Sequence, residues 1–194
     1  MRQPDRSKRT GDALRAGDVH ARQGAPGVEG IRTSAIAWLL LSLAVLLLDQ
    51  VTKWWAMTAI PDDVAIAVVE GWWNWRRSYN PGAAFGLLGG AGGWQRPVLA
   101  ALALGVSAYL VYSLYRLPRR AWRLAVPYAL VIGGALGNAA DRLSRGQVVD
   151  FIQWYWRDFF WPTFNVADMA IVIGAVAIAA NGLMPPKLSQ GQAS

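Results

Sequence analysis

Hydrophobic residues along this chain gather in four long runs separated by polar stretches. The runs cover approximately residues 34–55, 95–115, 121–140 and 166–184. Each is close to the roughly 20 residues that an α-helix needs to cross the hydrocarbon core of a bilayer. We therefore predict an integral membrane protein, mainly α, built as a four-transmembrane-helix bundle. Small residues from Gly133 to Gly137 in the third run have the spacing that lets another helix approach closely.

A different pattern follows the first run. Val64, Ile66 and Val68 alternate with alanines, and Trp73 and Trp75 alternate after a glycine break. Alternation with a period of two is typical of strands, and tryptophan favours the membrane interface. We predict a small periplasmic β element of two or three strands that lies on the membrane.

These patterns divide the chain into three regions. We expect a disordered cytoplasmic N-terminal tail (1–33), a membrane domain (34–184) with periplasmic loops 56–94 and 143–165, and a short cytoplasmic C-terminal tail (185–194). A secretory signal peptide with its apolar core at 36–48 is another interpretation of the first run. Asp49 and Lys53 interrupt that core before any cleavage site, and the polar lead is too long, so we favour a membrane span.

Basic residues predict the orientation of the spans. The formal net charge is +7, arginine and lysine concentrate in the N-terminal tail and between the second and third runs, and Lys187 follows the fourth run. Such residues favour the cytoplasmic side, so both termini are predicted there. These arginines lie beside apolar runs and do not form the continuous basic surface that is typical of nucleic-acid-binding proteins. We therefore expect no nucleic-acid partner.

Composition also limits the chemistry. There is no cysteine, and the single histidine, His20, lies in the polar tail. A thiol nucleophile, a Ser-His-Asp triad and a histidine-ligated zinc are therefore excluded. We expect no metal and no cofactor, and catalysis is left to aspartate, serine, lysine and arginine.

The predicted topology brings the polar residues of the apolar segments to one membrane level. Near the outer ends of spans or in the outer loops lie Asp49, Lys53, Asn80, Asn138, Asp141, Arg142, Asp150, Asn165 and Asp168. Polar groups are costly inside a membrane, and their convergence in apolar surroundings is typical of a functional site. We therefore place the active site near the periplasmic surface.

Neighbouring residues predict different roles for the charged side chains. Asp49 and Lys53 are four residues apart, so they share a helix face and can form a structural ion pair. Asp141 is followed by Arg142 and, one turn later, by Arg145. Because nearby cations keep a carboxylate ionised, Asp141 is interpreted as an orienting residue.

Asp150 and Asp168 have only apolar neighbours in sequence and no adjacent cation. If two such carboxylates meet, they share one proton, so that one acts as acid and the other as base. This is the chemistry of an intramembrane aspartyl peptidase. A structural alternative is that Asp168 caps the fourth helix and Asp150 lies in a solvated loop.

Five motifs in order resemble those of bacterial lipoprotein signal peptidase (signal peptidase II), an aspartyl peptidase family. They are Asp49-Gln-Val-Thr-Lys53, Asn80-Pro-Gly-Ala-Ala-Phe-Gly86, Gly134-Ala-Leu-Gly-Asn138-Ala-Ala-Asp141-Arg142, Val149-Asp150-Phe151 and Phe164-Asn165-Val-Ala-Asp168. The resemblance covers about residues 35–184. It implies an inner-membrane endopeptidase that removes the signal peptide of a diacylglyceryl-modified prolipoprotein by cutting before the lipidated cysteine.

The resemblance also implies a role for each matched residue. The catalytic aspartates correspond to Asp150 and Asp168. Residues that bind or position substrate correspond to Asn80, Asn138, Arg142 and Asn165, and supporting residues to Asp49, Lys53 and Asp141. The expected partners are the prolipoprotein, membrane lipids and inhibitors of the globomycin type. The tail before Ser34 is long for the family.

Two other functions fit parts of the pattern. One is a serine/lysine peptidase with Lys53 as base and Ser78 or Ser107 as nucleophile, although neither serine is well placed by sequence. The other is a small membrane transporter or assembly subunit that uses the polar cluster as an ion path.

Overall fold

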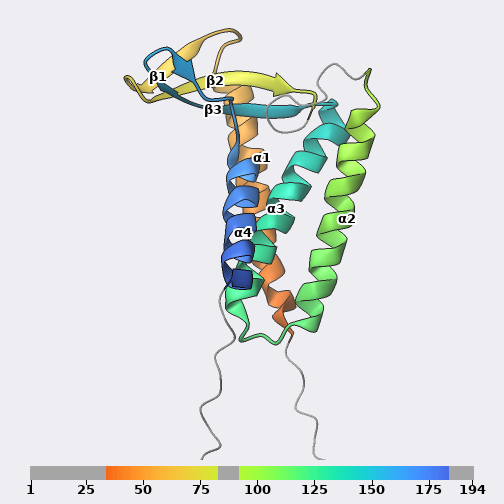
Figure 1. The fold of residues 1–194 in the computed structure, drawn as a ribbon. Coiled ribbons are helices and arrows are strands. Elements are labelled where there is room, and N and C mark those ends of the chain that lie inside the picture. Colours follow the sequence, from red (N-terminus) through yellow and green to blue (C-terminus); the bar gives the residue numbers. More distant parts are fainter. Residues whose placement is uncertain (1–33, 83–91, 184–194) are drawn as a thin grey trace, which may run out of the picture. The chain divides into compact units, whose positions relative to one another are not determined.

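The computed structural model describes residues 34–82 and 92–183 (Figure 1). Four helices in these residues are long and apolar enough to cross a membrane. They are α1 (Leu39–Ala59), which follows a 3₁₀ turn (Ala35–Trp38), α2 (Gln95–Arg116), α3 (Trp122–Arg145) and α4 (Val166–Leu183). The predicted four-helix membrane fold is therefore confirmed. The predictions for the two tails and for residues 83–86 of the second motif lie outside the described residues.

Helix α3 is the centre of the bundle and contacts each of the other three helices. Its apolar window is 61% buried, against 17–22% for the other helices, which leaves their outer faces available to lipid. The predicted small-residue face makes these contacts. A Cβ atom added at Gly133 would lie 2.6 Å from the Ser42 carbonyl oxygen in α1, and one at Gly134 would collide with the Ala167 carbonyl in α4.

Helix α3 also extends five residues beyond the predicted limit of 140, to Arg145. It ends at Gly146, which has a φ of 76° and the left-handed conformation that commonly terminates a helix. The extension matters because it places Asp141, Arg142 and Arg145 on regular helical turns that face the site.

An antiparallel sheet of four strands lies across one end of the helices (Figure 1). Its strands are, in order, β1 (Ala65–Val69), β2 (Trp73–Asn80), β3 (Val148–Trp156) and β4 (Phe159–Phe160). The predicted strands before residue 81 are present, but the prediction was incomplete, because β3 and β4 come from the segment predicted only as a loop. Residues Val148 to Gln153 are all buried, so β3 lacks the alternation that identifies a half-exposed strand.

Apolar packing fixes β3 to the end of α1. Phe151 and Ile152 form a buried cluster with Ala56 and Ile60. The register then sets Asp150 opposite Ser78 of β2, and Asp150 turns toward the ends of α3 and α4.

Candidate active site

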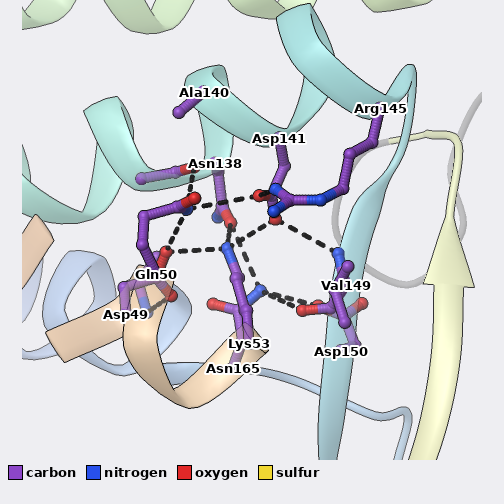
Figure 2. A network of polar contacts seen from close by, with 12 residues as sticks. Asp49, Gln50, Lys53, Asn138, Ala140, Asp141, Arg145, Val149, Asp150 and Asn165 are labelled. Atoms are coloured by element: carbon purple, nitrogen blue, oxygen red, sulfur yellow. Dashed lines mark hydrogen bonds and ion pairs between the residues drawn. The ribbon is translucent and has the colours of Figure 1, made fainter. Parts of the chain in front are cut away.

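A buried lysine joins α1 to α3 (Figure 2). The Lys53 Nζ atom lies 2.8 Å from a carboxylate oxygen of Asp49 and 2.8 Å from one of Asp141. It also donates a hydrogen bond to Asn138 Oδ1 at 2.9 Å. An ammonium group has three hydrogens, so all of them are engaged, and the side chains of the lysine and both aspartates are fully buried. The predicted pair of Asp49 and Lys53 is therefore present, and Asp141 completes it.

Asp141 links this charged group to strand β3. One carboxylate oxygen accepts a hydrogen bond from Arg145 at 2.6 Å, and the other accepts one from the Val149 backbone N–H at 3.2 Å. Gln50 also donates to Asp141 at 3.2 Å. Two cations thus balance the two carboxylates Asp49 and Asp141, as burial of charge requires. Since Val149 precedes Asp150, Asp141 helps to fix the position of that carboxylate.

Lys53 also determines which way the Asn138 amide points. A lysine ammonium can only donate, so the amide oxygen of Asn138 must face it. The amide nitrogen then faces the start of α4 and donates to Asp168 Oδ1 at 2.7 Å. Lys53 therefore orients the Asn138 amide nitrogen so that it donates to Asp168.

Asn165 contacts both carboxylates of the predicted pair. Its side-chain nitrogen donates to Asp150 Oδ1 at 2.7 Å, and its backbone N–H donates to Asp168 Oδ2 at 3.3 Å. Its side-chain oxygen accepts the Asp168 backbone N–H at 2.9 Å, which makes a reciprocal cap at the start of α4. The capping role considered for Asp168 is therefore real, and it places the carboxylate beside the residue that holds Asp150.

Asp150 lies in a strongly desolvated position and is 2% exposed. Burial, and then the charge of nearby Asp168, raise the pKa of the Asp150 carboxyl to about 7. Among the described residues, its Oδ2 atom accepts a long hydrogen bond, 3.4 Å, from the Asn80 side-chain nitrogen. The Asp150 carboxyl therefore gains or loses a proton near neutral pH, and Oδ2 is the more weakly held of its two oxygens.

Arg142 holds the turn after β2. Its guanidinium donates to the Gly82 carbonyl oxygen at 2.8 Å and to the Asn138 carbonyl oxygen at 3.3 Å. The Gly82 N–H in turn donates to Asn80 Oδ1 at 3.0 Å. The Nε atom of Arg142 is buried without a hydrogen-bond partner among the described residues. Of the two arginines that follow Asp141 in sequence, it is Arg145 that forms the ion pair.

The structure joins all of the predicted site residues in one hydrogen-bonded network. From α1 come Asp49 and Lys53, from β2 Asn80, from α3 Asn138, Asp141 and Arg142, from β3 Asp150, and from the start of α4 Asn165 and Asp168. The roles assigned to them stay predictions. Sequence reasoning assigned no role to Gln50, although it lies inside a quoted motif, and backbone groups such as the Val149 N–H carry no signal in the sequence.

The serine/lysine alternative does not fit this geometry. Lys53 has committed its three hydrogens to Asp49, Asp141 and Asn138. It has no hydrogen left for a bond to either candidate serine, and the hydroxyl of Ser107 is buried with no hydrogen-bond partner among the described residues.

Comparisons with known proteins show which sequences and structures this chain resembles. A family model described as "Signal peptidase (SPase) II" matches residues 41–184. The chain is 54% identical over 156 residues to a lipoprotein signal peptidase of Xylella fastidiosa (strain M12), a match that covers 80% of this chain and 93% of the relative. It is 54% identical over 157 residues to a lipoprotein signal peptidase of Xanthomonas campestris pv. campestris (strain 8004), covering 81% and 94%.

Solved structures show the same architecture. A structure titled "Bacterial membrane enzyme structure by the in meso method at 2.3 A resolution" superposes with a TM-score of 0.68 and 28% identity, covering 81% of this chain and 94% of the other. A second, with the same title at 1.9 Å, gives a TM-score of 0.63 and 29% identity over 77% and 94%.

Proposed function

This chain belongs to the signal peptidase II family, and from that premise we propose that it removes the signal peptide of prolipoproteins as an aspartic endopeptidase with Asp150 and Asp168 as its catalytic pair. One observation supports the aspartic assignment above the others, which is that Asn165 donates hydrogen bonds to both carboxylates. Its side-chain nitrogen lies 2.7 Å from Asp150 Oδ1, and its backbone nitrogen lies 3.3 Å from Asp168 Oδ2. Such sharing holds two ionisable groups close together in a buried setting, where one proton serves both.

The contacts distinguish the two carboxylates. Asp150 has a pKa raised to about 7 and is assigned the acid, which is protonated in a large fraction of molecules at neutral pH. Asp168 accepts a hydrogen bond from the Asn138 amide at 2.7 Å, and the positive charge of Arg142 acts on it. This hydrogen bond and this electrostatic interaction both favour the ionised form of the carboxylate, and on that ground Asp168 is assigned the base.

Hydrolysis then follows the chemistry of a paired acid and base. Asp168 takes a proton from a water molecule, whose oxygen attacks the scissile carbonyl carbon while Asp150 donates its proton to the carbonyl oxygen. The resulting tetrahedral diol collapses as the C–N bond breaks. One hydroxyl proton of the diol returns to Asp150, and the leaving nitrogen takes the proton from Asp168, so the starting state is restored.

The remaining site residues are assigned to positioning. Asn80 and Arg142 hold the turn at Gly82 beside Asp150 and are placed to meet the substrate backbone. We further propose that the substrate cysteine carries a diacylglyceryl group, that globomycin-type inhibitors occupy this site, and that the protein lies in the bacterial inner membrane with both termini cytoplasmic. The dyad then lies near the periplasmic surface, where tryptophans of the sheet and its turns, such as Trp154 at 55% and Trp72 at 58% exposure, meet lipid headgroups.

A cleavage assay tests the assignment. Purified full-length protein is incubated with a diacylglyceryl-modified prolipoprotein, and the shift in product mass is followed. Asp150→Asn and Asp168→Asn are each expected to abolish cleavage. Asp158→Asn, in the exposed turn between β3 and β4, is the matched control and retains parental activity. Substantial turnover by either dyad variant would show that the assignment is wrong, and no hydrolysis by the parent would favour the transporter alternative.

A further inference from the structure

Residues at the start of α3 and the end of α4 line a groove. This end of the bundle lies away from the sheet (Figure 1). The volume of the groove is about 450 Å³. The lining includes Arg123, Leu124, Tyr128, Ile178, Asn181 and Gly182. None of these residues belongs to the network around the aspartates, so the groove is a separate feature of the molecule.

Two glycines of α4, Gly174 and Gly182, lie in different surroundings at this end of the bundle. Around Gly174 the helices touch, since an added Cβ would lie 2.8 Å from the Pro127 carbonyl oxygen. At Gly182, two turns further along α4, an added Cβ would meet nothing within 4 Å. Within the described residues, the space between the helices is therefore closed at Gly174 and open at Gly182.

The polar part of the groove is organised by the same proline. Pro127 has no backbone N–H, so it leaves the Arg123 carbonyl oxygen without its helical partner. Asn181 of α4 satisfies that oxygen at 2.9 Å and also donates to the Ala177 carbonyl at 2.8 Å. Arg123 itself also lines the groove, and its guanidinium lies 5.7 Å from the centre of the Trp122 ring.

Positive charge at this end of the bundle has no acidic counterpart in the described part of the chain. Arg116, Arg119, Arg120 and Arg123 lie within one short stretch of sequence. The described carboxylates instead belong to the dyad network, the sheet or its turns, and they are Asp49, Asp62, Asp63, Glu70, Asp141, Asp150, Asp158 and Asp168. Exposed aromatic side chains at the same end, Tyr115 at 63% and Trp122 at 57%, are typical of the membrane interface.

We propose that this groove binds an anionic phospholipid. Its phosphate pairs with the Arg123 guanidinium, because arginine offers a planar set of donors that matches a phosphate. One acyl chain lies over Leu124, Tyr128 and Ile178, which give the groove its apolar wall. The Arg123 guanidinium selects an anionic headgroup over a zwitterionic one, because no carboxylate of the described residues lies at this end of the bundle to neutralise it.

Native mass spectrometry of the full chain in detergent tests the proposal. The probe is dioleoyl phosphatidylglycerol, and dioleoyl phosphatidylcholine carries the same acyl chains without net charge. Arg123→Gln removes the phosphate contact and Gly182→Leu fills the open space. Each variant is expected to weaken the tightest phosphatidylglycerol binding by about tenfold, the scale of one charge-assisted hydrogen bond.

Two control variants distinguish a specific lipid site in the groove from general electrostatic attraction between the lipid and the arginines. Arg116→Gln removes the same charge at the same end of the bundle but outside the groove lining, and Gly105→Leu adds the same side chain to an exposed face of α2. Both are expected to bind as the parent does. Equal losses in Arg116→Gln and Arg123→Gln would overturn the proposal in favour of diffuse surface charge. So would equally tight phosphatidylcholine binding, or displacement of the lipid by millimolar inorganic phosphate. Because the readout is binding and not cleavage, its failure is distinct from failure of the proposed function.

Discussion

Replacing Asp150 by asparagine should stabilise the folded protein while it abolishes cleavage. The Asp150 carboxyl has an ordinary pKa of 3.8, raised in the fold to about 7 by burial and then by Asp168. The folded protein therefore binds more protons than the unfolded protein between these two values, and stability is lost as the pH rises through that window. An amide does not ionise, and it keeps an oxygen that accepts the hydrogen bond from Asn165.

The size of the effect follows from the shift. A difference of roughly three pKa units corresponds to about 4 kcal/mol at 1.36 kcal/mol per unit. We expect Asp150→Asn to be more stable than the parent by about this amount at pH 8, by less at pH 6, and by little near pH 4. The charge of Asp168 is present in both proteins, so the comparison isolates the cost of ionising Asp150.

Unfolding of the purified proteins in mixed micelles with increasing dodecyl sulfate, at pH 5, 6, 7 and 8, measures the difference. Asp158→Asn is the control, because its exposed side chain leaves stability unchanged at each pH. A stability difference that does not grow with pH would refute the reasoning, as would an Asp150→Asn protein less stable than the parent at pH 8.

Three further predictions rest on the same network. Lys53→Met removes the cation that pairs with the buried carboxylates of Asp49 and Asp141, and it should lower the free energy of unfolding by about 3–5 kcal/mol. Adding Asp49→Asn to this variant should restore part of the lost stability. A Lys53→Met protein of parental stability would contradict this. Gly137→Ala places a Cβ 2.5 Å from the Asp49 carboxylate and should destabilise by about 1–3 kcal/mol, whereas Gly105→Ala meets open space and should not. Because Asp150 is assigned the acid and has a pKa of about 7, kcat/KM should fall as the pH rises above 7, and a flat profile to pH 9 would exclude that assignment.

Much of the fold could be predicted because the membrane simplifies the problem. A fixed hydrocarbon thickness requires apolar runs of a set length, and the four predicted runs correspond to α1 to α4. Strands β1 and β2 were visible through their alternation. Strand β3 was not, because Val148 to Gln153 are buried throughout, and a continuously buried segment has no period to detect.

The site, like the fold, could be predicted only in part from the sequence. Topology alone indicated which residues gather at one level, since spans that alternate in direction bring their ends together. It could not indicate which of those residues touch. Asp49 accepts a hydrogen bond from the Ala167 backbone N–H, 118 residues away, and nothing in the sequence near either residue marks that contact.

By itself the sequence thus determined the spans, the membrane level of the polar residues and the kinds of chemistry that they can perform. Only the tertiary structure decided that Lys53 orients the Asn138 amide and that Asn165 lies between Asp150 and Asp168. The physical reason is that hydrophobic length is a local property of the chain, whereas the direction of a hydrogen bond depends on atoms brought together by packing from several distant segments.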